Sequence, residues 1–314
     1  MKMLFTYILT VFVFTGCAAN NAAPGSNTRM AKQPSSEAGT DKLAFADVHM
    51  HFNWDQEELV SADEAYESII KQNVVLAVVF STPTKNALKL TNKDSSLFIP
   101  FFSPYITGHS RSNWFRDENV LKQARKGLEN KTYFGIGELH VVPGIGPSRD
   151  NKIFQGLLKL AEEFNVPFNI HTEAASYKFL EPICKKYSKV RFLWAHGGGL
   201  LGPEHSEGVF KSCPNVWVEL SARDPKHYGG LVDENSKLRK EWKDVISKYP
   251  DRFMVGTDPV WNAHQMNRWY EADEGWKHYD LFVNFHRNWL SELPTNVEQK
   301  VRLENALKFF NKTH

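Results

Sequence analysis

Two histidines separated by one residue end the apolar run "FADVHMH" at residues 45–51. In an extended strand, side chains at positions i and i+2 leave on the same face, so His49 and His51 are expected to point in one direction from the carboxyl end of this strand. Two imidazoles on one face can supply half of the ligands of a metal site. A pair of partly exposed histidines at a strand edge is the alternative, and these two residues alone do not decide between them.

Polar residues of the same chemical kind follow other apolar runs. They are Glu138 in "YFGIGELH", His171 in "PFNIHTE", His196 in "VRFLWAH" and Asp258 in "FMVGTDP". Any one of them has a simpler explanation, such as a hydrogen-bonded core histidine or, for Asp258 before proline, a turn residue. Together, four imidazoles and two carboxylates form a nitrogen and oxygen ligand set that suits zinc, manganese or iron. Burying so many polar groups without a cation would be costly, so the set predicts a metal centre.

These residues belong to a regular succession of strands and helices. Short runs rich in Val, Ile and Phe alternate with segments of helical period, such as 61–73 and 151–165, which begin at a Ser or Asn cap. The predicted strands are 45–51, 76–82, 98–105, 133–140, 167–173, 190–196, 216–222 and 253–259. Their near-continuous apolar character indicates burial on both faces, as in a parallel sheet.

Eight strand and helix repeats favour a closed (β/α)8 TIM barrel, in which the carboxyl ends of the strands converge on one mouth. An open doubly wound sheet is the alternative. Such a sheet often carries a glycine fingerprint after its first strand, whereas "HMHFNW" contains no glycine. The barrel therefore places the six candidate ligands together.

The motifs "DVHMH", "GIGELH", "NIHTE", "WAHGGG", "VGTDP" and the closing "LENALKFF" resemble the amidohydrolase superfamily, particularly its amidohydrolase-related branch, from about residue 45 to the C-terminus. The resemblance implies a metal-dependent barrel in which His49, His51 and Asp258 hold one metal and His171 is a further ligand. His196 would bind a second metal or orient water and substrate. Members with two metals often bridge them with a carboxylated lysine or a glutamate, and here the strand-four motif offers Glu138.

The expected reaction is hydrolysis of a small amide, ester or lactone, with one or two divalent ions, zinc foremost, activating water. Asp258 would accept the proton of that water and return it to the leaving group. Two alternatives stay open. One is a metal-dependent decarboxylase of the same family, and the other is a binding lipoprotein without turnover.

Residues that recognise the substrate are expected in the loops after the strands. Arg223 follows strand seven and Arg149 lies in the loop after strand four, and either could pair with a substrate carboxylate or phosphate. Trp261 and Trp54 follow metal-bearing strands and could form apolar walls, although core packing explains a tryptophan equally well. His140, two positions after Glu138, is expected to support that residue.

The first residues predict export. Lys2 and the apolar stretch after it are typical of a signal peptide, and "FTGC" resembles a bacterial lipobox whose Cys17 would be lipidated. Ordinary secretion is the alternative. Residues 1–17 are thus predicted to be the signal, 18–42 a flexible tether and 43–314 the barrel. The protein is expected to be lipid-anchored in a bacterial cell envelope and to face the periplasm or exterior.

Composition excludes some partners. Lys and Arg number 38 and Asp and Glu 36, so nothing favours nucleic acid, and a small-molecule substrate is the expected partner. Membrane contact is expected through the lipid anchor only, and oligomeric state is left open. Cys184 and Cys213 lie outside any cysteine metal motif. They are expected to be buried free thiols, with a disulfide as the alternative in an oxidising compartment.

Overall fold

The computed structural model describes residues 42–108, 110–142, 146–260 and 274–312. Its eight strands are all parallel to their neighbours. They are β1 (Phe45–His51), β2 (Val74–Phe80), β3 (Phe98–Pro100), β4 (Ile136–His140), β5 (Phe168–His171), β6 (Phe192–Trp194), β7 (Val216–Glu219) and β8 (Phe253–Met254). Each predicted strand has an observed counterpart, so the expected succession of elements is confirmed.

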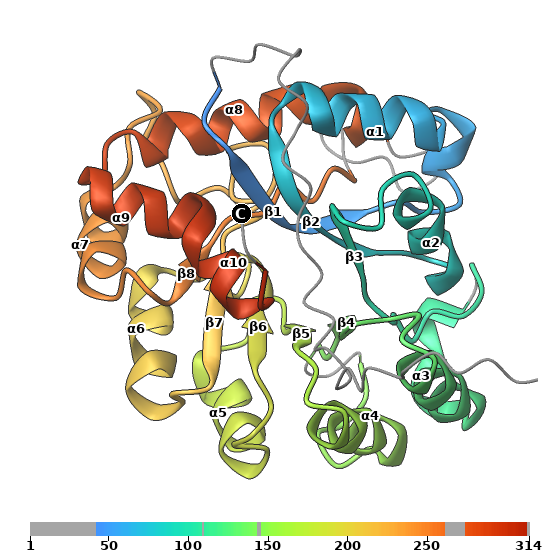
Figure 1. The fold of residues 1–314 in the computed structure, drawn as a ribbon. Coiled ribbons are helices and arrows are strands. Elements are labelled where there is room, and N and C mark those ends of the chain that lie inside the picture. Colours follow the sequence, from blue (N-terminus) through green and yellow to red (C-terminus); the bar gives the residue numbers. More distant parts are fainter. Residues whose placement is uncertain (1–41, 109, 143–145, 261–273, 313–314) are drawn as a thin grey trace, which may run out of the picture.

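Helices alternate with the strands and surround them (Figure 1). They are α1 (Ala62–Lys71), α2 (Ala87–Thr91), α3 (Asn119–Glu129), α4 (Lys152–Glu163), α5 (Tyr177–Lys186), α6 (Pro203–Ser212), α7 (Lys240–Lys248), α8 (Tyr279–Leu290), α9 (Thr295–Gln299) and α10 (Asn305–Phe309). The side chains of Ser61 and Asn151 cap α1 and α4, which satisfies backbone N–H groups that have no partner inside the helix. Among the described residues, no helix combines the length and apolar composition needed to cross a membrane.

Regular strand pairing gives two sheets, β1 to β3 and β4 to β8, and backbone hydrogen bonds join them at both junctions. The N–H of Gly137 donates to Phe102 O (2.9 Å), and the N–H of Val48 donates to Val255 O (3.0 Å). At the second junction, Gly256 lies so close to β1 that an added Cβ would sit 2.7 Å from His49 Cβ. These contacts complete the TIM barrel and bring β8 against the strand that carries the two histidines.

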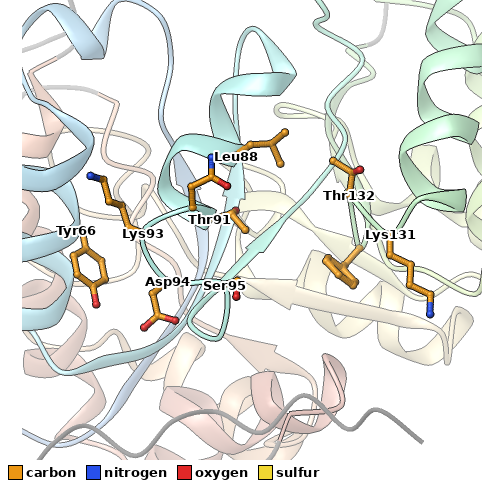
Figure 2. A pocket seen from close by; sticks show the side chains of 10 residues that line it. Tyr66, Leu88, Thr91, Lys93, Asp94, Ser95, Lys131 and Thr132 are labelled. Carbon is orange, nitrogen blue, oxygen red and sulfur yellow. The ribbon is translucent and has the colours of Figure 1, made fainter. Parts of the chain in front are cut away.

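The two ends of the barrel differ. At the end where the strands start, α10 packs Ala306 and Phe309 against barrel residues such as Val48 and Met254. A cavity of about 800 Å³ also lies at this end, lined by residues of α1 and α2 and of the segments after α2 and before β4, including Asp94 and Lys131 (Figure 2). Since the candidate ligands lie at the opposite end, this cavity is not part of their site.

Every predicted strand except 45–51 extends beyond the observed strand, and at two of them the candidate ligand lies past the end of the strand. The strand predicted at 190–196 stops at Trp194, and the one at 253–259 stops at Met254. His196 and Asp258 follow on turns with positive φ values of 56° and 52°, which non-glycine residues rarely adopt. Such backbone conformations concentrate at functional sites, where the surrounding structure holds them.

The expectation of free thiols is wrong. Cys184 in α5 and Cys213 after α6 form a disulfide. These two helices are neighbours around the barrel, so cysteines 29 positions apart in the sequence come within bonding distance. The predicted signal peptide, Cys17 and the predicted tether up to residue 41 lie outside the described residues.

Candidate metal centre

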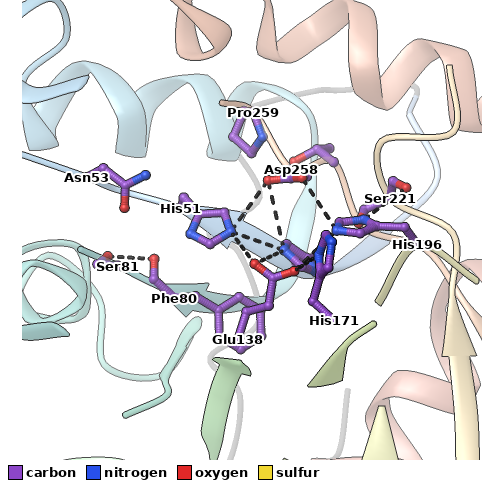
Figure 3. A network of polar contacts seen from close by, with 12 residues as sticks. His51, Asn53, Phe80, Ser81, Glu138, His171, His196, Ser221, Asp258 and Pro259 are labelled. Atoms are coloured by element: carbon purple, nitrogen blue, oxygen red, sulfur yellow. Dashed lines mark hydrogen bonds and ion pairs between the residues drawn. The ribbon is translucent and has the colours of Figure 1, made fainter. Parts of the chain in front are cut away.

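The six predicted ligands converge at the carboxyl ends of the strands (Figure 3). They come from both sheets and from the turns after β6 and β8. Their exposed fractions are His49 0%, His51 4%, Glu138 2%, His171 4%, His196 2% and Asp258 7%. Three carboxylate or imidazole groups within 4.8 Å of one another occur in several combinations here, as a metal site requires.

The first part of the centre contains His49, His51 and Asp258. The register of β1 against β2 shifts between Asp47 and Met50, and the two histidines still point the same way, with their Nε2 atoms 3.1 Å apart. Asp258 Oδ1 lies 3.5 Å from His51 Nε2 and 3.9 Å from His49 Nε2. The predicted relation between the HxH motif and strand eight is therefore present in the fold.

Glu138 links this part to a second one, which contains His171 and His196. Its Oε2 lies 3.3 Å from His51 Nε2 and 3.7 Å from His49 Nε2. Its Oε1 lies 2.7 Å from His171 Nδ1 and 3.2 Å from His196 Nε2. One carboxylate thus presents an oxygen to each pair of imidazoles, which is the arrangement expected of a bridging ligand.

Glu219, at the end of β7, belongs to the candidate centre and was missed by the sequence analysis. It is completely buried, and its Oε1 accepts hydrogen bonds from His49 Nδ1 (2.8 Å) and from the backbone N–H of His196 (2.9 Å). Burial favours the neutral form of Glu219, but the charges of His49 and His196 and these hydrogen bonds lower its pKa to about 2. The carboxylate is charged, and it orients one histidine from each part of the centre.

Asp47 is the second missed residue. Its buried carboxylate accepts hydrogen bonds from the Thr257 hydroxyl (2.6 Å), the Tyr279 hydroxyl (2.9 Å) and the backbone N–H of His49 (3.2 Å). It therefore fastens β1 to the segment after β8 and to α8. Its place two residues before His49 on one strand was the signal that could have revealed it.

The donor set fits a divalent cation. Asp258 Oδ1 is buried and has no hydrogen-bond donor within the described part of the chain. Burial alone would lower the pKa of His49, but Glu219, Glu138 and Asp258 hold it well above the usual value, so these carboxylates favour positive charge at this point. Acceptor oxygens and imidazole nitrogens that converge without enough protons are the environment that a metal ion neutralises.

The two arginines predicted to bind substrate lie away from the candidate ligands. Both terminal nitrogens of Arg223 donate to backbone carbonyls of the loop after β6, at Gly199 and Leu201, and its guanidinium packs over Trp242. Arg149 lies on the surface over the Phe179 ring and donates to the Phe179 carbonyl. The structure therefore brings neither arginine into the metal centre, and both are engaged by backbone carbonyls of their own surroundings.

Two tryptophans were expected to form apolar walls. Trp54 is about half exposed, at the carboxyl end of β1. Trp261 lies outside the described residues. His140, expected to support Glu138, has its Nε2 3.9 Å from Glu138 Oε2 and stacks on the His171 ring at 4.3 Å.

Comparison with known proteins agrees with the fold. The family model described as amidohydrolase matches residues 113–312. A TatD homologue from Escherichia coli has 17% identity and a TM-score of 0.56, over 85% of this chain and 98% of that one. A probable 2-pyrone-4,6-dicarboxylic acid hydrolase from Acinetobacter baumannii has 13% identity and a TM-score of 0.53, over 85% and 99%.

A third solved structure, dihydroxybenzoic acid decarboxylase from Polaromonas sp. JS666 with bound manganese, has 10% identity and a TM-score of 0.53, over 85% of this chain and 97% of that one. No curated protein matches the chain. Identities this low show a common fold and leave the reaction open. The match of the family model over more than half of the chain shows that it belongs to the amidohydrolase family.

Proposed function

We propose that this protein is a metal-dependent hydrolase that cleaves a small amide, ester or lactone. The observation that carries the proposal is the position of Glu138, whose two oxygens face two separate pairs of imidazoles. A carboxylate in this position suits two divalent cations held close together, and such pairs recur in hydrolytic enzymes. Zinc is the proposed metal because the ligands are mainly imidazoles with carboxylates.

The residues divide between two cation positions. His49, His51 and Asp258 would hold the first cation and His171 and His196 the second, with Glu138 contributing one oxygen to each. A bound divalent cation lowers the pKa of a coordinated water and polarises a substrate oxygen. The chain supplies the remaining functions, which are orientation of these ligands and transfer of protons.

Asp258 is the proposed proton acceptor. Its Oδ1 faces His49 and His51, while its Oδ2 lies 3.9 Å from His196 Nε2, on the side of the second pair. Oδ2 can therefore accept the proton of an attacking water as the water oxygen bonds to the substrate carbonyl. The same oxygen then returns this proton to the leaving amine or alkoxide when the scissile bond breaks.

Product analysis in ¹⁸O-labelled water tests the proposal. Metal-loaded protein is incubated with a panel of small amides, esters and lactones and, separately, with aromatic and unsaturated acids, and the products are analysed by mass spectrometry. Hydrolysis places one ¹⁸O atom in the new carboxylate. Release of carbon dioxide from an aromatic or unsaturated acid, without label in the organic product, would assign the protein to decarboxylases and contradict the proposal.

We also propose that the protein acts in the bacterial cell envelope, anchored through lipidated Cys17. The disulfide between Cys184 and Cys213 supports an oxidising compartment, where such bonds form and persist. Cys17→Ala should move the protein from the membrane fraction to the soluble fraction after cell lysis. A variant that stays in the membrane fraction after normal signal cleavage would contradict the anchor.

A further inference from the structure

His140 differs from the other imidazoles of the centre in its exposure. Its side chain is 26% exposed, whereas those of His49, His51, His171 and His196 are at most 5% exposed. It extends β4 beyond Glu138 and stacks on His171, so it borders the second pair of ligands. Its ring is thus in a position to meet a molecule that enters the mouth.

Hydrogen bonds to Tyr105 determine which nitrogen of His140 carries the proton. The Tyr105 hydroxyl oxygen accepts the backbone N–H of His140 (3.0 Å) and lies 2.6 Å from His140 Nδ1. Tyr105 is buried, and a hydroxyl proton without an acceptor would be costly there. The hydroxyl therefore donates to Nδ1, which leaves the proton of the neutral ring on Nε2.

The Nε2–H group has no acceptor at hydrogen-bond distance among the described residues. Glu138 Oε2, at 3.9 Å, is too far away. A ring nitrogen of His140 lies within 4.8 Å of ligand atoms of Glu138 and His171. With Nδ1 accepting from Tyr105 and the proton on Nε2, however, the neutral ring has no free lone pair for a metal ion. His140 is instead a hydrogen-bond donor at the edge of the centre.

A positive charge lies next to Tyr105, the partner of this donor. The Arg111 guanidinium is 5.8 Å from the centre of the Tyr105 ring, in the short 3-10 helix Ser110–Ser112 after β3. Arg111 is exposed, and the hydrogen bonds and ion pairs among the described residues do not include its guanidinium. Burial raises the pKa of Tyr105 and lowers the pKa of His140, and the Arg111 charge favours a lower pKa for both groups, as expected for a cation near them. One free N–H and one unpaired guanidinium therefore lie on the β3 and β4 side of the mouth.

We propose that the His140 Nε2–H and the Arg111 guanidinium form a subsite for a carboxylate of the substrate. This proposal rests on the proposed hydrolase function and narrows its substrates to small acids that carry the scissile bond and a separate carboxylate. Arginine and a neutral N–H together match one carboxylate in charge and in number of donors. The carboxylate would hold the substrate next to the second pair of imidazoles, His171 and His196. The hydrogen bond from Tyr105 to His140 Nδ1 would keep the proton on Nε2.

Binding of benzoate and benzamide to the metal-loaded protein tests the subsite, because the two probes differ mainly in charge. The parent protein should bind benzoate at least about tenfold more tightly than benzamide, the difference expected from one charge-assisted hydrogen bond. Arg111→Gln and His140→Phe should each weaken benzoate binding about tenfold, while His140→Gln, which keeps a donor, should lose less. Arg116→Gln is the matched control, since Arg116 also packs over a neighbouring aromatic ring, that of Phe115.

Two further measurements test which nitrogen of His140 carries the proton and whether His140 binds a metal ion. In ¹⁵N-labelled protein, His140 should be protonated at Nε2, and Tyr105→Phe should abolish this preference. His140→Phe should keep the parent's metal content. Unchanged benzoate binding in Arg111→Gln, a proton on Nδ1, or loss of a metal ion in His140→Phe would each overturn the subsite. These tests need no turnover, so failure to find a hydrolysed substrate would count against the proposed function alone.

Discussion

At the level of single residues, hydrogen bonds to one ring nitrogen of a histidine leave the other ring nitrogen available as a metal ligand. Glu219 accepts from His49 Nδ1, so the Nε2 atom that faces His51 and Asp258 is left as the ligand atom. Ser221 Oγ contacts His196 Nδ1 at 2.8 Å, so Nε2 of that histidine faces Glu138. Buried groups behind the imidazoles thus decide which nitrogen each one offers.

Asp258→Asn tests proton transfer. Asparagine keeps nearly the same shape and an oxygen that can bind metal weakly, but it cannot act as a base at neutral pH. The variant should fold, keep part of its metal and lose turnover by about 10² to 10⁴, the usual contribution of a general base. The control Asp251→Asn, in a surface ion pair with Lys300, should stay within a few-fold of the parent. Parental turnover in metal-replete Asp258→Asn would refute the proton-transfer role.

Glu219→Gln tests orientation of the histidines. In either orientation the glutamine NH2 group would face a backbone N–H, of His196 or of Ser221, from which the carboxylate now accepts a hydrogen bond, so the side chain would shift and hold His49 and His196 less well. Metal affinity should fall by about 10-fold to 100-fold, the usual effect of removing a group behind a metal ligand. Competition with a chromogenic chelator measures this affinity. Glu163→Gln, in a surface pair with Arg125, is the control, and equal affinities in the two variants would contradict the role of Glu219.

At the level of elements, the sequence was sufficient to locate the eight strands and to place ligands at their ends. The apolar runs determine the strands, and polar residues that interrupt an apolar run stand out. Glu219 was missed because "VWVEL" also fits a strand whose glutamate faces solvent. Its presence directly after buried strand residues, as at Glu138, was the available signal.

Contacts between distant segments could not be predicted in the same way. His196 and Asp258 have positive φ values, and their backbone N–H groups donate to Glu219 Oε1 and to the His49 carbonyl on other strands, contacts that local sequence does not specify. The arginine side chains were free to reach any nearby acceptor, and Arg223 binds the backbone of the adjacent loop. The pairing of Cys184 with Cys213 depends on the way α5 packs against α6 around the barrel, with Cα atoms 6.1 Å apart.

The disulfide should stabilise this part of the barrel. Closing a loop between residues 29 positions apart restricts the unfolded chain, which corresponds to about 3.5 kcal/mol in the chain-entropy treatment. The double variant Cys184→Ala/Cys213→Ala should therefore unfold at lower urea concentration than the parent. Adding reductant should destabilise the parent and leave the double variant unchanged. A parent whose unfolding does not respond to reductant would contradict this expectation.

At the level of the whole molecule, the two ends of the barrel differ: one packs against the C-terminal helix, and the other carries the candidate metal centre. At the end covered by α10, apolar side chains of this helix pack against the barrel, and Arg302 next to this helix donates to the Ala44 carbonyl at the start of β1. The opposite end holds the six candidate ligands. The chain before residue 42, predicted to be a signal and a tether, has no apolar pattern between residues 18 and 42 that could add to the core.

Removal of residues 1–41 should leave a folded protein that keeps its metal, because a tether of small and polar residues contributes no packing. Urea unfolding should remain a single cooperative transition with a midpoint close to that of the longer chain. Metal content should be equal in the two forms. Loss of the cooperative transition would place the start of the folded domain before residue 42.

The central claim is that Glu138 joins two cation sites in one centre. Metal content, measured by mass spectrometry on protein purified without chelators and dialysed against zinc, tests it most directly. The parent should hold about two divalent ions per chain, and Glu138→Gln should hold about one, retained by His49, His51 and Asp258. One ion in the fully active parent, with the same content in Glu138→Gln, would contradict the account.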